Sequence, residues 1–364
     1  MQYVIYFIYN IDNIYKFTKE YKNIAMLYIF IEMFTIFCFL LLTSIVNASI
    51  IDRFHNWVSQ FDIHFRDDSH FSEIYRKWVS NDKLIDFVNS QNMSYTLGHN
   101  QFSGMDTDDF RKYVQLYAVT IPDTPVQTST NIENLQSLPI SVDWVSTGAV
   151  TPVKDQGQCG SCWSFSTTGA LESAYFNKYG TLVSFSEQQL VDCDNLQNGG
   201  RDHGCNGGLM DNAFSWIQKN GGLCSEKDYP YVSGSTKTAG TCSKTCKVDS
   251  NSKVQKFVDV SPNSDDEMMT ALTKQTVSVA IEADQPAFQL YKSGVFTGSC
   301  GTTLDHGVLV VGYGKEGSLD YYTVKNSWGT TWGLNGYIKL GRGPSYNNGK
   351  GQCGVLMEAS YPVL

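Results

Sequence analysis

The sequence predicts an α+β fold in which helices come first and short strands follow. Before residue 250, apolar side chains recur at helical spacing, for example over residues 162–179 and 209–219. After residue 250 the chain changes to short runs rich in β-branched and aromatic residues, which are typical of strands: Val254–Val260, Val277–Ala283, Gly307–Tyr313, Tyr321–Lys325 and Tyr337–Leu340. A helical half followed by a β-rich half favours two lobes with a cleft between them.

End signals support the individual helices. The helix expected at residues 186–193 opens with a Ser-x-x-Gln capping box from Ser186 to Gln189. The helix expected at residues 162–179 stops at Gly180, and the one at residues 209–219 stops at a Gly-Gly pair.

Composition limits the functions open to this chain. Its 364 residues carry a formal net charge of −9 and a sequence pI near 5.1. So acidic a chain is not expected to bind nucleic acid. The length suits an N-terminal prosegment followed by a domain of two lobes.

Residues 1–48 are predicted to be a secretory signal peptide. Lysines precede an apolar run that ends in the cleavage pattern Val46-Asn47-Ala48, and a start at Met33 would give a conventional signal. The alternative is a signal anchor, because residues 24–46 are long enough to span a bilayer. After signal cleavage, no stable membrane association is expected.

Residues 49–137 are predicted to form a prosegment and its linker, and residues 138–364 a mature domain. The prosegment is amphipathic and ends in a short capped helix at residues 106–113. Residues 120–138 are rich in Pro, Thr, Ser and Asn, as in an exposed, cleavable linker. A glycosylation sequon predicts a glycan on Asn92.

Cysteine counting predicts one free thiol. Of ten cysteines, Cys38 lies in the signal segment and would be removed with it, which leaves an odd number. We assign the free thiol to Cys162. Disulfides imply an oxidising secretory route. Four of them are expected from the other eight cysteines, in pairings that counting does not fix: Cys159, Cys193, Cys205, Cys224, Cys242, Cys246, Cys300 and Cys353.

Cys162 is also the predicted nucleophile. It begins a helix, whose dipole stabilises a thiolate. The side-chain amide of Gln156, together with the backbone N–H of Cys162, would bind the oxyanion of a tetrahedral intermediate. A redox pair or half a zinc site is the other interpretation of Cys159-x-x-Cys162, but no second C-x-x-C with zinc spacing and no βαβ pattern accompany it. No metal or organic cofactor is therefore expected.

A thiol nucleophile needs a base, and the chain after the linker contains only two histidines. His203 lies in a Gly-rich loop and is expected to be solvated. His306 opens an apolar strand 144 residues after Cys162 and is the predicted base. Asn326 would orient its ring and suit a thiolate–imidazolium pair, while Trp328 would shield that hydrogen bond from water.

Six motifs carry a family resemblance: Val153-Lys154-Asp155-Gln156-Gly157, the run from Cys159 to Trp163, Ser186-Glu187-Gln188, Cys205-Asn206-Gly207-Gly208, Asp305-His306-Gly307 and Asn326-Ser327-Trp328-Gly329. With these motifs, nearly all of the chain after the signal resembles papain-family cysteine proteases of the cathepsin L-like branch. The resemblance implies a papain-like two-lobe fold, with a helical left lobe, a β-barrel-like right lobe and the active-site cleft between them, preceded by a helical inhibitory propeptide.

The resemblance also implies disulfide pairings. Cys159 would pair with Cys205, and Cys300 with Cys353. Cys193 would pair near Cys242, which leaves Cys224 with Cys246 as a bridge that the family core lacks. Whether Cys242 and Cys246 exchange partners stays open.

A substrate groove is implied in the same way. Gly208 would pair with the extended substrate backbone, at a position where a side chain would obstruct. Glu358 would lie at the floor of the pocket for the second residue before the scissile bond, where its carboxylate would admit Arg as well as Phe or Leu. The alternative is that Glu358 points to solvent. The other groove residues that the resemblance implies are Gly207, Leu209, Met210, Ala280, Leu304, Asp305 and Gly307.

The prosegment departs from the family pattern at several positions. The interspersed helix motif keeps Trp78, Asn81, Ile85 and Asn89, but its earlier acidic and Arg positions are occupied by His70 and Ile74. Gly104 takes the place of an Asp, and Asp106 follows two residues later. Inhibition by the chain's own propeptide is still expected, whereas the pH trigger of release is open.

The sequence thus predicts the zymogen of a cysteine endopeptidase, monomeric, and lysosomal or secreted. Protein and peptide substrates and cystatin-type inhibitors are its expected partners. The rival is a catalytically silent storage or inhibitor-binding relative, which should have lost Cys162, Gln156 or His306. An exopeptidase would need a His-bearing loop near residues 224–246, which contain no His. A peptide ligase would be distinguished by its products with an added amine.

Overall fold

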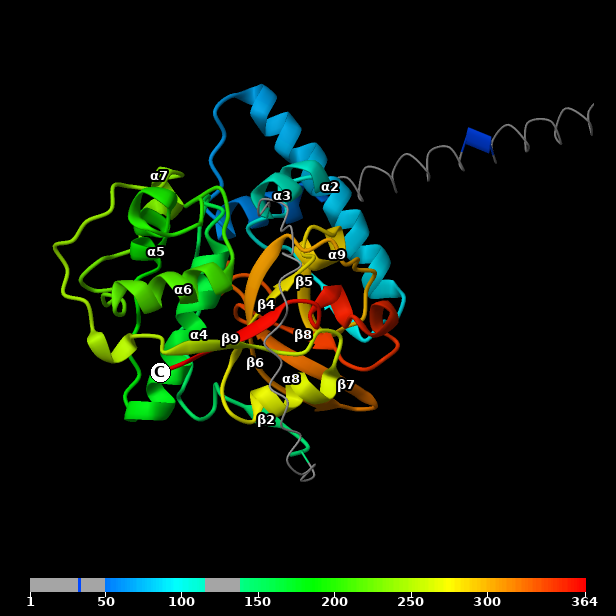
Figure 1. Ribbon diagram of the computed structural model, residues 1–364. Coiled ribbons are helices and arrows are strands. Elements are labelled where there is room, and N and C mark those ends of the chain that lie inside the picture. The colour runs from blue at the N-terminus through cyan, green and yellow to red at the C-terminus, as the bar shows by residue number, and fades with distance from the viewer. Residues whose placement is uncertain (1–31, 34–49, 115–137) are drawn as a thin grey trace, which may run out of the picture. The chain divides into compact units, whose positions relative to one another are not determined.

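The computed structural model describes residues 32–33, 50–114 and 138–364 (Figure 1). The predicted signal segment, apart from residues 32–33, and nearly all of the predicted linker lie outside the described residues. The chain divides into two units, residues 1–64 and 65–364. In the first unit a helix covers residues 50–60, with the rings of Phe54 and Trp57 5.7 Å apart. No helix among the described residues is both long and apolar enough to cross a membrane.

The second unit begins with the prosegment elements α2 (Asp68–Ser90), β1 (Tyr95–Leu97) and α3 (Thr107–Val114). The predicted capped helix is confirmed, because Asp106 Oδ1 accepts a hydrogen bond from the backbone N–H of Asp109 at 3.0 Å. The strand β1 was not predicted. It pairs antiparallel with β5 (Tyr291–Phe296) of the mature domain, so its conformation depends on a distant partner.

The mature domain contains the predicted helices. They are α4 (Cys162–Tyr179), α5 (Glu187–Cys193) and α6 (Met210–Asn220), whereas the short α7 (Ser233–Thr236) was not predicted. Gly180 ends α4 in the left-handed region, at φ 71°.

The capping box is only half formed. Ser186 Oγ accepts a hydrogen bond from the backbone N–H of Gln189 at 2.9 Å. The Gln189 side chain does not return to Ser186, because its Oε1 accepts from the backbone N–H of Cys224 at 2.7 Å.

The strands form an open sheet in the order β1-β5-β8-β7-β6-β4-β9-β3, with β2 paired to β6. Two further helices, α8 (Asp265–Leu272) and α9 (Pro286–Gln289), accompany it. The strands are β2 (Val142–Asp143), β3 (Lys256–Asp259), β4 (Val277–Ile281), β6 (His306–Glu316), β7 (Leu319–Lys325), β8 (Tyr337–Gly341) and β9 (Ala359–Val363). The mixed helical and sheet content confirms the α+β prediction, and the strands β2, β5 and β9 of the mature domain were missed.

The described residues form two hydrophobic cores, and α4 belongs to the core of the helical lobe while it packs against β6 of the sheet lobe (Figure 1). The first nine residues of β6 are all buried, which marks it as the central strand. Gly169 lets α4 approach β6 closely, because a Cβ at Gly169 would lie 2.8 Å from Leu309 Cδ2.

Four disulfides pair in the way that the resemblance implies: Cys159–Cys205, Cys193–Cys242, Cys224–Cys246 and Cys300–Cys353. Among the described residues, Cys162 is the one cysteine outside them, and it is buried.

Candidate active site

Cys162 is the first residue of α4 and is fully buried. Its Sγ accepts a hydrogen bond from the backbone N–H of Gly307 at 3.4 Å. Gly307 directly follows His306, so the start of α4 meets the start of β6. The sulfur of the predicted nucleophile therefore lies against the strand that carries the predicted base.

His306 and Asn326 come together at one end of the sheet. Strands β6 and β7 run antiparallel with Leu309 opposite Lys325, and Asn326 follows Lys325 directly. His306 Nε2 lies 2.8 Å from Asn326 Oδ1. Because the amide oxygen only accepts, the ring must carry its proton on Nε2, which leaves Nδ1 as an acceptor. Nδ1 has no hydrogen-bond partner among the described residues.

Trp328 covers this pair as predicted. Its ring stacks on that of His306 with centroids 4.7 Å apart and planes at 26°, and the Trp328 side chain is fully buried. The hydrogen bond to Asn326 is thereby kept from water.

Burial favours the neutral forms of both reacting groups. Desolvation raises the pKa of Cys162 to about 12, although hydrogen bonds from the backbone N–H groups of Gly307 and Trp163 oppose it. Desolvation lowers the pKa of His306 to about 4, against the effect of Asn326. Both groups are fully buried in this proform, and the thiolate–imidazolium pair expected for the resting enzyme stays a prediction.

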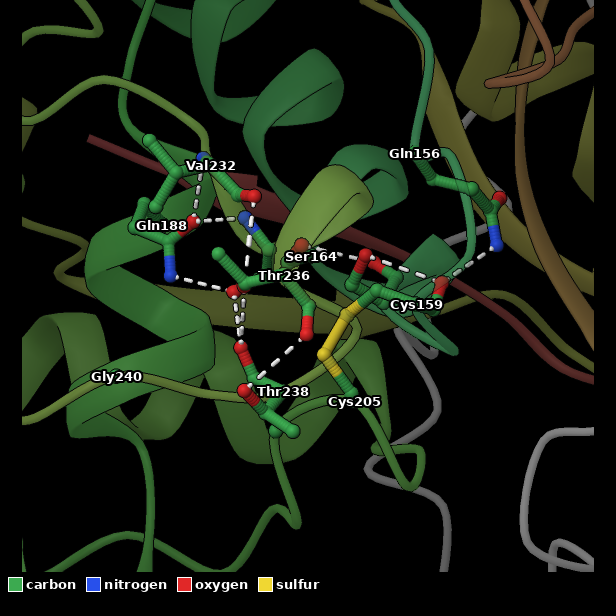
Figure 2. Close-up of a disulfide and its surroundings, with 12 residues drawn as sticks. Gln156, Cys159, Ser164, Gln188, Cys205, Val232, Thr236, Thr238 and Gly240 are labelled. Carbon is green, nitrogen blue, oxygen red and sulfur yellow. Dashed lines mark hydrogen bonds between the residues drawn. A yellow bond between two sulfur atoms is a disulfide. The ribbon is translucent and has the colours of Figure 1, made fainter.

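The side chain of Gln156 is oriented by Ser327, a residue that the sequence motifs include but to which no role was assigned. Ser327 Oγ donates to Gln156 Oε1 at 2.7 Å, which turns the amide NH₂ away from Ser327. Gln156 Nε2 then donates to the carbonyl oxygen of Cys159 at 3.1 Å (Figure 2). Ser327 follows the predicted Asn326, and this adjacency was the available signal.

Neither Gly207 nor Gly208 can carry a side chain without backbone strain or a clash with neighbouring residues. Gly207 has φ 106°. A Cβ at Gly208 would lie 2.6 Å from Trp163 Cδ2 and 2.7 Å from Asp202 Cγ. A side chain at Gly208 would therefore clash with the interior of the helical lobe, and the pairing of Gly208 with a substrate backbone stays a prediction. Asp202 also orients the segment, because its Oδ1 accepts from the backbone N–H of Leu209 at 3.0 Å. The neighbouring His203 is exposed, as expected.

Met210, Ala280 and Leu304 are buried in one core cluster, and a Cβ at Gly307 would lie 3.2 Å from Met210 Sδ. Ala280 is opposite Gly307 in the pairing of β4 with β6, so these two predicted groove residues and Met210 lie together, while their role in binding substrate stays a prediction. Asp305 is held elsewhere, since its Oδ1 accepts from the backbone N–H of Ala283 at 2.7 Å.

Glu358 does not point to solvent. Its backbone oxygen accepts from the N–H of Ala280 at 3.1 Å, which fixes it beside β4. Its Oε2 is buried without a hydrogen-bond partner among the described residues. Burial, and then the neighbouring Asp211 and Asp259, raise the pKa of this carboxyl to about 7.

The prosegment packs on Trp328. Gln101 Nε2 donates to the Trp328 carbonyl oxygen at 2.6 Å. The rings of Phe102 and Phe110 each lie edge-on to the indole at 5.4 Å. The indole therefore contacts the His306 ring and the prosegment at once.

A buried thiol at a helix start, beside an amide-oriented imidazole and under a docked prosegment, defines a thiol-dependent hydrolase in its proform. Residues 138–363 match the papain family of cysteine proteases, and residues 54–110 match the cathepsin propeptide inhibitor domain (I29). The chain belongs to the papain family.

Named relatives agree with this assignment. The chain is 42% identical over 323 residues to the senescence-specific cysteine protease SAG39 of Oryza sativa subsp. japonica, covering 87% of this chain and 91% of that protein. The proform of the ragweed pollen allergen Amb a 11 superposes with a TM-score of 0.77 at 36% identity, over 86% of this chain and 94% of the other. Digestive procathepsin L 3 of Tenebrio molitor gives 0.73 at 34% identity, over 86% and 99%.

Proposed function

We propose that this papain-family protease is an endopeptidase in which Cys162 forms the acyl-enzyme and His306 is the base. The observation that carries the proposal is the 2.8 Å contact of His306 Nε2 with Asn326 Oδ1. It leaves Nδ1 as the acceptor, on a strand that touches Cys162 Sγ through Gly307.

The steps follow from these positions. Nδ1 of His306 takes the thiol proton as Cys162 Sγ attacks the substrate carbonyl carbon. The resulting oxyanion is bound by Gln156 Nε2 and the backbone N–H of Cys162. His306 then protonates the leaving amine, and water, activated by the same imidazole, hydrolyses the thioester. Asn326 keeps the ring in one tautomer throughout.

Activation removes residues 49–137, with cleavage in the segment 120–138. Solvent then reaches Cys162 and His306, so the desolvation that favours the neutral pair falls and the dipole of α4 favours a thiolate. Four disulfides support passage through the secretory pathway, to a lysosome, another acidic compartment or the cell exterior. We propose a monomer that cystatin-type inhibitors bind, with a glycan on the exposed Asn92.

The pocket beside Glu358 should accept Phe or Leu and also Arg. A substrate guanidinium would pair with the carboxylate, whereas an apolar side chain would prefer the neutral acid. Because the pKa of Glu358 is raised to about 7, the activity ratio of an Arg-Arg to a Phe-Arg reporter should rise as the pH approaches and passes 7. In Glu358→Gln the ratio should no longer rise with pH. If the ratio in this variant rises with pH as it does in wild type, the pocket assignment is rejected.

The test of the proposed activity uses the recombinant proenzyme at acid pH with a thiol reductant. Wild type should shorten to a form that starts near Leu138 and take one epoxide label on Cys162, while Cys162→Ser should do neither. Equal cleavage of a reporter peptide by both proteins would show that Cys162 is not the nucleophile. Absence of labelling and cleavage at every pH would support a catalytically silent relative, which no present observation favours.

A further inference from the structure

Tyr231 contacts both sides of the proposed oxyanion site. Its hydroxyl donates to the Gln156 carbonyl oxygen at 2.7 Å and lies 2.7 Å from Ser161 Oγ. A tyrosine hydroxyl has one proton, so Ser161 donates in the second bond. Gln156 carries one oxyanion donor, and Ser161 directly precedes Cys162, which carries the other. One hydroxyl therefore joins the two segments that must keep a fixed spacing.

The loop behind Tyr231 is itself anchored. Gln188 Oε1 accepts from the backbone N–H groups of Val232 and Ser233 at 2.8 and 2.9 Å (Figure 2). Glu226 Oε1 accepts from the backbone N–H of Tyr231 at 2.8 Å. Hydrogen bonds therefore fix the backbone of Tyr231 itself and join the next two residues of the loop to α5.

Close packing transmits this anchoring to the site. The ring of Tyr231 lies edge-on to that of Phe165 on α4, with centroids 4.9 Å apart. The loop also touches the segment after Gln156, because a Cβ at Gly157 would lie 2.7 Å from Gly234 Cα. A shift of the loop that carries Tyr231 would therefore also shift the segment that carries Gln156.

We propose that Tyr231 is a positioning residue that sets the spacing of the two oxyanion donors. The inference rests on the proposed roles of Gln156 and Cys162. Tyr231 makes no contact with substrate in this scheme and acts through the backbone of Gln156 and the hydroxyl of Ser161. Preorganised donors stabilise the tetrahedral intermediate more than the bound substrate, so the effect should fall on kcat.

Tyr231→Phe removes both hydrogen bonds and keeps the ring packing. In the processed enzyme, with active sites titrated by an epoxide, we expect kcat to fall about tenfold with little change in KM. Affinity for a peptide aldehyde should fall by the same factor, because the thiol adds to its carbonyl and places the oxygen in the same site. Alkylation of Cys162 by iodoacetamide forms no oxyanion, so its rate and pH profile should stay unchanged.

Tyr229→Phe is the matched control. Its hydroxyl also donates a strong hydrogen bond, to Asp192 Oδ2 at 2.8 Å, but it does not touch the segment of Gln156 or Ser161. All three readouts should stay within about twofold of wild type.

A double variant separates this inference from the proposed function. On a Gln156→Ala background, Tyr231→Phe should add less than a twofold further loss of kcat, because one donor is already absent. If Gln156→Ala lowers kcat and Tyr231→Phe does not, the role of Tyr231 is refuted and the oxyanion site stands. If Gln156→Ala has no effect, the oxyanion assignment fails first. An equal loss in hydrolysis and alkylation would assign Tyr231 to the thiol instead.

Discussion

The two lobes are stabilised differently. The helical lobe contains three of the four disulfides, Cys159–Cys205, Cys193–Cys242 and Cys224–Cys246, around helices joined by long loops. The sheet lobe contains Cys300–Cys353 and otherwise depends on continuous strand pairing around the buried β6. Covalent links hold the lobe that carries the proposed nucleophile, and a hydrogen-bonded ladder holds the lobe that carries the proposed base. Of the four predictions that follow, three test this contrast and one concerns the prosegment.

The largest effect is expected where both lobes contribute equally. Cys162→Ser and His306→Gln should each lower kcat/KM of the processed enzyme by roughly 10⁴-fold or more, and the double variant should be no worse than either. His203→Gln, at the exposed histidine, should stay within about twofold. A comparable loss in His203→Gln would reassign the base.

Disulfide removal should act locally. Replacing Cys224 and Cys246 by serine should lower the free energy of unfolding by about 3 kcal/mol, from the chain entropy of a loop of this length. Hydrogen exchange should then lose protection in α5 and around residues 240–250, while β6 and β7 stay protected. Replacing Cys300 and Cys353 by serine is the corresponding experiment in the sheet lobe. Loss of protection throughout both lobes would contradict separate stabilisation.

The prosegment should lose stability in acid through Lys77. This buried lysine lies 2.7 Å from Glu73, 2.5 Å from Asp109 and 3.5 Å from Asp106. Lys77 lowers the pKa of Glu73, and the backbone N–H of Asp109, followed by Lys77, lowers the pKa of Asp106. Groups with lowered pKa values stabilise the fold above their unfolded values and lose that effect as the pH falls through the folded ones.

In the Cys162→Ser proenzyme, Lys77→Met should therefore make the prosegment about tenfold more sensitive to an added protease at pH 7. It should also flatten the further rise in sensitivity below about pH 4.5. Lys83→Met, an exposed lysine on the same helix, is the control. An unchanged pH profile would place the acid trigger elsewhere.

The smallest effect is expected where α4 packs against β6. Gly169→Ala should cost about 1 kcal/mol in the unfolding free energy, because overpacking against Leu309 exceeds the gain in helix propensity. Adding Leu309→Val should recover most of this loss by making room. If Gly169→Ala instead raises the unfolding free energy, α4 and β6 can adjust their packing to the added methyl group.

The sequence predicted the elements with strong local signals. The helix Cys162–Tyr179 was visible because it has a helical period and a glycine after its end, and β6 was visible as an apolar run. Strand β9 was missed because Pro362 argues against a strand, although here it pairs at the register of Phe257. Strand β5 contains a glycine in the left-handed region, Gly294, which also weakens the pattern.

The candidate site shows the same limit. Cys162, His306 and Asn326 were identified by residue type and motif, and the structure brings them together. The burial that raises the pKa of Cys162 and lowers that of His306 was not predictable, because desolvation depends on the whole packed structure. Tyr231 was missed as well, since its two hydrogen bonds join segments 70 and 75 residues away in sequence.

The pairing of β1 with β5 has a consequence for the protease after maturation. In the strand order, β1 is terminal and β5 is second, joined on its other side to β8. Loss of the prosegment turns β5 into the end of the sheet, with backbone groups that had partners in β1. Such an edge is a template for association with another chain, and an exposed lysine on it, Lys292, opposes that association. Until it is removed, the propeptide therefore also covers a sheet edge that could otherwise pair with another chain.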